Sequence, residues 1–362
     1  MPIEESDPFR YPFSARTESW GHPANYFADE KVPKHPCEFS ERSESWERRD
    51  QFWAAELQKV DPDAKACVER TFKRSNNLVR EHLRAETGLK LNVGDEVTSI
   101  PVEVVDGIPP PLAELLDRFA AIAPFILRLP LLRSMVDGLR FLEANEDLAD
   151  DILIAESGGE PPVDLLAGGV LRHVRAYTEA LLDLVSAKQA QRSMLMIERD
   201  VMGAYFFRKG RIQLYWMPIA IIAKSLGVSI ESLTIIVLAH ELAHAYTHRG
   251  RDIDGHDWPT EPFSHADLRI VEGFAQHYAE AVCRRLAPRE PDLTPTFERL
   301  LTYQSEPYTA FKGWIESGSE SVRGEIMRST LIATRHARIC DYGEFMPLVM
   351  QRSAQIKGVR RT

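Results

Sequence analysis

Two histidines and a glutamate in the segment Leu238–Tyr246 have the residue types and the spacing of a zinc site. His240 and His244 are four residues apart, so on an α-helix they share one face, about 6 Å apart along the axis, and both imidazoles can reach one ion. Glu241 lies at the edge of that face. There a carboxylate can take a proton from a metal-bound water without binding the metal itself. The pattern predicts metal-assisted hydrolysis with Glu241 as the general base.

The neighbouring residues place this motif on a buried helix. Ser229 is a suitable N-cap, the stretch 233–239 is apolar apart from Thr234, and Arg249-Gly250 supplies a cationic last turn and a stop. A helix whose middle is apolar on every side belongs inside a domain. Imidazoles and a carboxylate at the end of such a helix are costly to bury unless they are paired or bind a ligand, which favours a metal site.

A catalytic zinc site has three protein ligands and leaves one position for water, so a third ligand must come from elsewhere. Glu272 lies in a second helical pattern, from about Asp267 to Leu286, with an apolar side that can pack across the first helix. His248 is about 12 Å from His240 along the axis, too far to share one ion, and we expect it to be partly exposed near the last carbonyls of the helix. No spacing rule supports the remaining candidates, which are Asp252, Asp254, His256, Asp257 and His265.

The motif His240-Glu241-x-x-His244 followed by Glu272-Gly273-Phe274-Ala275 resembles the gluzincin metallopeptidases, a group of zincins whose third zinc ligand is a glutamate on a later helix. The resemblance covers about Tyr205 to Leu286 and implies a Zn²⁺ ion held by His240, His244 and Glu272. Gln276 stands where thermolysin-like enzymes have an acid, and its amide oxygen is able to orient a ligand imidazole. The exopeptidase motif of the aminopeptidases has no counterpart in this chain.

Two aromatic-rich runs upstream predict a β-hairpin. They are Gly203–Phe207 and Arg211–Trp216, joined by a turn that contains Gly210. In zincins such an edge strand borders the cleft, where it can pair with an extended peptide through main-chain hydrogen bonds. An equally good interpretation makes both runs core strands without a substrate role. Pro218 then begins a short helix that Gly227 ends.

Peptide hydrolysis also needs a donor for the oxygen that gains negative charge, and the fold decides which residue supplies it. The sequence leaves six candidates open: His265, His277, Tyr278, Tyr308, His336 and Tyr342. We expect His277 and Tyr278 to pack on the Glu272 helix instead.

The fold class that these patterns predict is α+β and mostly helical, with a zincin-like catalytic domain and a small edge sheet. A tail at 1–45 precedes a mainly helical region at 46–190 and the metallopeptidase domain at 191–362. Short strand-like pieces are expected within 89–105, and a hinge at 158–162. The apolar patch 119–132 is too short and too broken by prolines to span a bilayer, so it predicts packed helices.

Composition limits the classes of partner and the compartment. A net charge of −10 argues against broad nucleic-acid binding, and the start of the chain has neither the basic nor the apolar region of an export signal. Four widely spaced cysteines predict reduced thiols in a cytoplasm. Cys37 has a regulatory alternative, as a thiolate that plugs the zinc site. The expected partner is a peptide or protein substrate, and the region 46–190 is a candidate surface for a protein partner.

Two other functions keep the same motif. A binding or regulatory protein with a zincin shape would hold a structural or inactive metal, closed by a fourth ligand from the 251–264 loop. A metallohydrolase of a non-peptide amide or ester would have a small closed pocket, whereas a long groove beside 211–216 favours peptides.

Overall fold

The computed structural model describes residues 44–91, 100–109, 112, 116, 120, 123–145, 169–185, 201–315 and 319–359. Nearly all of the predicted tail, with Cys37, and the predicted hinge at 158–162 lie outside these ranges.

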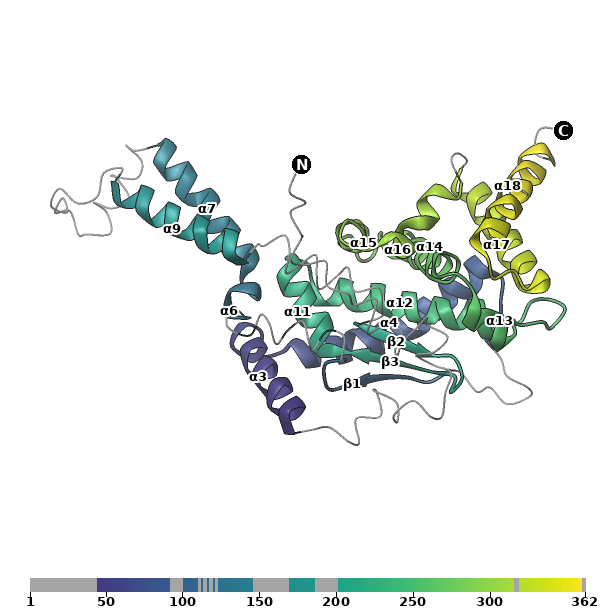
Figure 1. Cartoon of the computed structure of the whole chain (residues 1–362), viewed down its shortest axis with the longest axis horizontal. Helices are drawn as coiled ribbons and strands as arrows, with labels where there is room; N and C mark the ends of the chain where they lie inside the picture. Colours follow the sequence, from purple (N-terminus) through teal and green to yellow (C-terminus); the bar gives the residue numbers. More distant parts are fainter. Residues whose placement is uncertain are drawn as a thin grey trace, which may run out of the picture.

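The described chain is mostly helical with one small sheet, as the sequence predicts (Figure 1). The elements before residue 190 are α3 (Glu44–Val60), α4 (Ala64–Thr87), β1 (Val102–Val105), α6 (Ala123–Ile126), α7 (Leu129–Ala144) and α9 (Gly169–Val185). Those after residue 200 are β2 (Gly203–Phe206), β3 (Arg211–Tyr215), α11 (Trp216–Leu226), α12 (Ile230–Arg249), α13 (Thr260–His265), α14 (Leu268–Leu286), α15 (Leu293–Leu301), α16 (Glu306–Thr309), the 3₁₀ helix η3 (Ala310–Gly313), α17 (Glu320–Ala337) and α18 (Tyr342–Val359).

The helix that carries the motif, α12, is the centre of the fold. Its N-cap is the predicted one, because the Ser229 hydroxyl accepts a hydrogen bond from the Ser232 amide at 3.0 Å, and the helix ends before Gly250. In Figure 1 α14 lies on one side of α12, and the sheet and α4 lie on the other. Every residue from Ser232 to His248 is buried. Because other elements surround α12, its sequence is apolar on every side.

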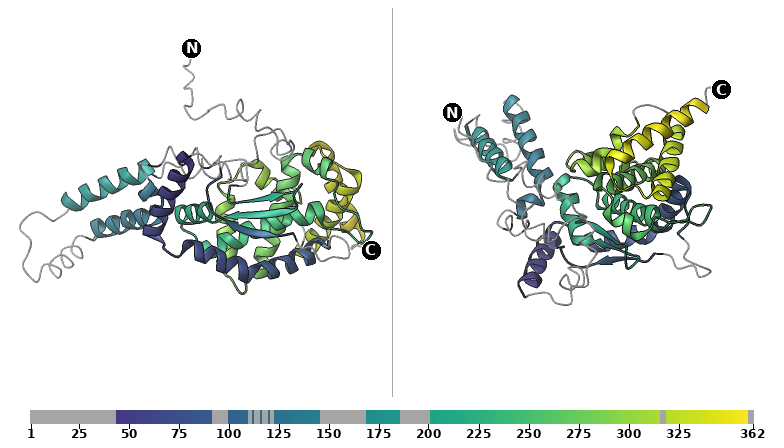
Figure 2. Two further views of the ribbon diagram at one scale, coloured as in Figure 1. Left: turned by 90° about the horizontal axis from the view of Figure 1, so that it is seen from below. Right: turned by 45° about the vertical axis from the view of Figure 1, so that its right-hand side comes forward.

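The sheet has the strand order β1-β3-β2 and is seen face-on in the left view of Figure 2. The predicted hairpin is present, with β2 antiparallel to β3 and Gly210 in the left-handed region at φ 62°. β1 adds to the other side of β3 in parallel, with Val102 opposite Ile212. β3 is therefore the central strand of the sheet, with a partner strand on each side. β2 is an outer strand of this sheet, and its four residues are buried.

Elements from both halves of the chain share one core. α4 packs along α12, and a single cluster of buried apolar side chains extends from Trp53 to Val349. The predicted boundary between residues 190 and 191 stays a prediction, but α4 and β1 precede it and help to position α12.

Helices α7 and α9 lie side by side and project from the body of the molecule (Figures 1 and 2). Arg140 of α7 forms an ion pair with Glu179 of α9. Arg175 of α9 forms one with Glu143 of α7. The apolar patch 119–132 contributes α6 and the start of α7. No helix among the described residues is long and apolar enough to cross a membrane.

Candidate metal centre

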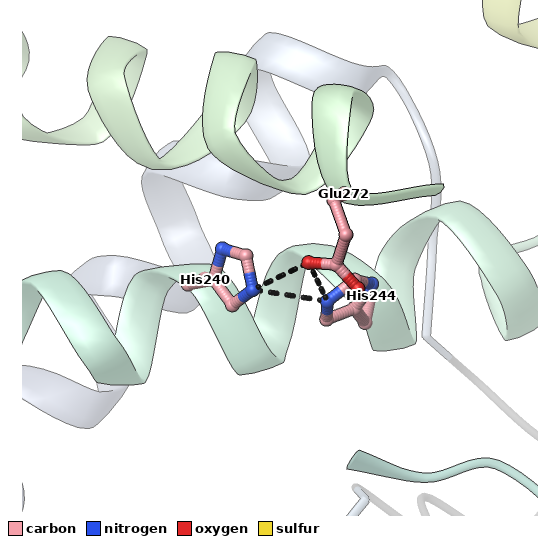
Figure 3. Close-up of side chains that lie close together, drawn as sticks. All are labelled: His240, His244 and Glu272. Carbon is pink, nitrogen blue, oxygen red and sulfur yellow. Dashed lines mark hydrogen bonds and ion pairs between the residues drawn. The ribbon is translucent and has the colours of Figure 1, made fainter. Parts of the chain in front are cut away.

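The three predicted zinc ligands come together where α12 and α14 cross. His240 and His244 project from one face of α12, and Glu272 reaches toward them from the first turns of α14 (Figure 3). α14 begins at its predicted position, where the Asp267 carboxylate accepts a hydrogen bond from the Arg269 amide at 2.9 Å. Gly273 follows the glutamate, and the Trp314 indole occupies the place of the missing side chain. Two helices from separate parts of the sequence thus fix the three side chains.

The donor atoms have the separations that a tetrahedral zinc site requires. Nε2 of His240 and Nε2 of His244 are 3.0 Å apart. Oε2 of Glu272 lies 3.2 Å from the first nitrogen and 3.3 Å from the second. Ligand atoms that surround one zinc tetrahedrally at about 2.0–2.1 Å stand about 3.3 Å from one another. The donor set, two imidazole nitrogens and one carboxylate oxygen, is also one that zinc accepts.

Burial and charge act on Glu272 in opposite directions. Burial alone raises the pKa of this carboxyl group, but attraction and hydrogen bonding to His244 and His240 outweigh it and hold the pKa below its usual range. Glu272 is therefore ionised at neutral pH. A buried carboxylate between two imidazoles supplies the negative charge that a divalent cation needs.

Within the part of the chain that the structure describes, the cluster has three members. Among the described residues, which include the whole 251–264 loop, no other histidine, cysteine, aspartate or glutamate joins His240, His244 and Glu272. Asp252 and His256 of that loop lie instead beside His336 of α17. The fourth ligand expected of a closed structural site is thus not supplied by the loop.

Glu241 is directed toward the sheet. Its carboxyl group is buried against Gly203 of β2, and an ideal Cβ atom at residue 203 would lie 2.7 Å from both Cγ and Oε1 of the glutamate. Real Cβ atoms do not approach other atoms so closely, so only glycine leaves room for this carboxylate. The spacing of the motif does not reveal this contact, because 38 residues separate the two positions.

A methyl group at residue 203 is therefore expected to displace the Glu241 carboxylate. We expect Gly203→Ala to retain stoichiometric zinc while hydrolysis slows by about 10²-fold, the loss that a shift of about 1 Å in a catalytic group produces. Gly138→Ala is the matched control, since a Cβ atom there meets nothing within 4 Å. Metal analysis and steady-state rates measure both effects. Unchanged turnover in Gly203→Ala would show that the position of this carboxylate does not limit the reaction.

The prediction for His248 is wrong. The side chain is fully buried, its Nδ1 lies 3.0 Å from the Tyr205 hydroxyl and its Nε2 lies 3.2 Å from the Thr260 hydroxyl. Its ring stacks on Phe263 at a centroid distance of 4.4 Å. Burial lowers the pKa of His248 to about 3, with smaller contributions from nearby cations, so the imidazole is neutral. It joins β2 and α13 to the end of the motif helix.

Gln276 makes a different contact from the predicted one. Its amide nitrogen donates to Oε1 of Gln304 at 2.9 Å, and its own Oε1 has no hydrogen-bond partner among the described residues. The predicted bond to a ligand imidazole is therefore not formed. The amide instead ties α14 to the segment after α15.

Of the six candidate donors, Tyr308 lies beside the centre. Its buried ring is 5.9 Å from the His240 ring, centroid to centroid. The other five contact residues elsewhere. His277 and Tyr278 pack against each other on α14, as predicted. Nδ1 of His265 is 2.8 Å from the Glu261 carbonyl oxygen, His336 pairs with Asp252, and the Tyr342 hydroxyl accepts a hydrogen bond from Trp314.

Comparison of this chain with protein-family models, with curated proteins and with solved structures finds no match.

Proposed function

We propose that this chain is a zinc-dependent metallopeptidase of the zincin type. The observation that carries the proposal is the buried cluster of His240, His244 and Glu272, whose donor atoms are 3.0–3.3 Å apart and which has no fourth member among the described residues. Three protein ligands with one open position are typical of catalytic zinc, whereas structural zinc has four. This difference favours an enzyme over a binding protein with a zincin shape.

Zinc bound to these three residues would act as a Lewis acid that activates water and polarises the carbonyl group to be attacked. The residues of the chain supply the remaining parts of the reaction. Glu241 accepts the proton of the attacking water as the water oxygen bonds to the carbonyl carbon. It then delivers that proton to the amine nitrogen as the carbon–nitrogen bond breaks. Gly203 keeps the space in which this carboxylate sits.

Tyr308 is our choice for the donor to the oxygen that gains charge. Its ring lies next to the ring of His240, and Tyr308 is a buried residue of α16. A phenol is neutral at physiological pH and can donate its O–H to an oxyanion. This assignment rests on proximity to His240, which none of the other five candidates has.

Peptides are the substrate class that fits the remaining features. Among the described strands β2 pairs with β3 alone, and it carries Gly203 directly beside the proposed general base. An outer strand next to the reacting groups can align an extended peptide through main-chain hydrogen bonds. The thiols of Cys67, Cys283 and Cys340 are free, which agrees with action in a reducing compartment such as the cytoplasm.

The test is hydrolysis of an unfolded protein, such as reduced casein, by the zinc-loaded chain, with new chain ends read by mass spectrometry. We expect cleavage that stops when a chelator removes zinc and returns when zinc is restored. Tyr308→Phe should retain zinc and be slower by about 10²–10³-fold, the loss seen when one oxyanion donor is removed. A fully loaded chain that produces no new peptide ends would contradict a peptidase. Cleavage of small acyl amides by the same sample would then favour a non-peptide substrate.

A further inference from the structure

A second group of two imidazoles and one carboxylate lies on the surface. It consists of Asp252 and His256, in the loop that follows α12, and His336 at the end of α17. One ligand atom from each residue lies within 4.8 Å of the others. The donor types are those of the buried cluster, but two separate chain segments, 84 residues apart, bring them together. The proposed function does not use these residues.

The Asp252 carboxylate is held in a fixed orientation. Its side chain is only 6% exposed, and Oδ1 accepts hydrogen bonds from the amides of Asp254 at 3.1 Å and His256 at 2.9 Å. Gly255, at φ 82°, allows the chain to turn back so tightly. The other oxygen, Oδ2, faces Nε2 of His336 at 2.8 Å. The turn thus directs one carboxylate oxygen toward the imidazole of α17.

A buried residue of α17 also holds the backbone of this loop. The buried Arg335 guanidinium donates to the carbonyl oxygens of Gly250 at 2.5 Å and His256 at 2.6 Å. Because Arg335 and His336 are consecutive, one turn of α17 holds both the backbone of His256 and the carboxylate of Asp252. The rings of His256 and His336 are consequently 5.1 Å apart at an interplanar angle of 74°. The corresponding values for His240 and His244 are 4.6 Å and 88°.

We propose that Asp252, His256 and His336 form a second site for a divalent transition-metal ion of the zinc class. Two imidazoles and a carboxylate suit zinc and its neighbours better than calcium or magnesium, which prefer oxygen ligands. The ion takes the place of the proton that His336 donates to Asp252. The bound ion then cross-links the loop after α12 to the end of α17, and we call this cross-link the clasp.

Exposure and charge make this site weaker than the buried one. The side chains of His256 and His336 are 65% and 42% exposed, so water competes for the ion and it exchanges with solvent. The positive charge of Arg335 opposes a cation, although Asp252 and Asp257 offset it. The second ion therefore binds and leaves as free zinc changes, and the clasp forms only when zinc is plentiful.

Equilibrium dialysis of the full chain against rising free Zn²⁺ tests the proposal. We expect two equivalents of zinc in the wild type and one in His336→Gln at the same free zinc. Glutamine can still donate a hydrogen bond to Asp252, so this variant removes the metal ligand and keeps the loop contact. His173→Gln, an exposed histidine of α9, is the control and should bind two. Equal zinc uptake by His336→Gln and the wild type at every concentration would overturn the site.

Hydrogen exchange tests the clasp separately. Zinc should slow exchange of the backbone amides at 252–257 in the wild type and leave it unchanged in His336→Gln. If zinc leaves the exchange rate of these amides unchanged in both proteins, the clasp does not form. The Glu272→Ala variant separates this proposal from the proposed function, because it lacks the buried ion and should still take up the surface one. A wild-type chain that binds both zinc ions and cleaves no peptide would contradict the peptidase and support the surface site.

Discussion

Glu272→Ala is expected to lose the buried zinc and, with it, all metal-dependent hydrolysis. The carboxylate is the only anionic member of the cluster and the only ligand that comes from α14. Without it only the two imidazoles of α12 remain, and two ligands on one helix hold zinc far more weakly than three. Loss of a partner that only supports a ligand already weakens metal binding by about 10–100-fold, so loss of a ligand should exceed that range. Elemental analysis of protein purified without added metal measures the effect.

Two variants define the cause of this loss. Glu280→Ala removes another glutamate of α14, one that forms ion pairs with Arg284 and Lys312, and it should retain the buried zinc. Glu272→Gln keeps the size of the side chain and removes its charge, and zinc binding should fall in this variant as well. If Glu272→Ala instead holds the buried ion as tightly as the wild type, the ligand set proposed here is incorrect. Thermal unfolding of the metal-free proteins shows whether the fold survives each change.

The part of the site that sequence predicts is the part set by local geometry. The bounds of α12 and α14 follow from Ser229, Asp267 and the apolar periodicity, and each cap is where the sequence places it. The i, i+4 spacing of His240 and His244 needs only the helical repeat. Glu272 needs more, because its approach depends on the crossing of two helices. The short phrase Glu-Gly-Phe-Ala suggested it through a resemblance, and the structure brings its carboxylate to both imidazoles.

Contacts between distant segments were not predictable in the same way. β1 precedes β3 by more than a hundred residues, and its parallel pairing makes β3 the central strand of the sheet. The place of His248 at a helix end predicts partial exposure, but Phe263 of α13 covers it. Gly203 carries no sign in the sequence of the carboxylate that lies against it.

Glu241→Gln is expected to separate metal binding from turnover. Glutamine has the shape of glutamate, so it should fit against Gly203 and leave His240 and His244 in place. Its amide cannot accept a proton as a carboxylate does. Loss of a general base lowers rates by about 10²–10⁴-fold, and we expect a fall of this size in kcat with one buried zinc per chain retained. Zinc analysis and peptide-cleavage rates on the same sample test both statements.

A second glutamate of the same helix provides the control for this variant. Glu231 lies in the first turn of α12, exposed and far along the helix from the cluster, and Glu231→Gln should be fully active. Turnover that survives Glu241→Gln would remove this residue from the chemistry. Loss of zinc together with turnover would instead give it a role in holding the metal. Gly203→Ala resolves the remaining ambiguity, because it leaves the carboxylate chemically intact and changes only its position. Slow turnover with bound zinc in both variants requires a carboxylate that is both ionisable and correctly placed, which is the definition of a general base at this centre.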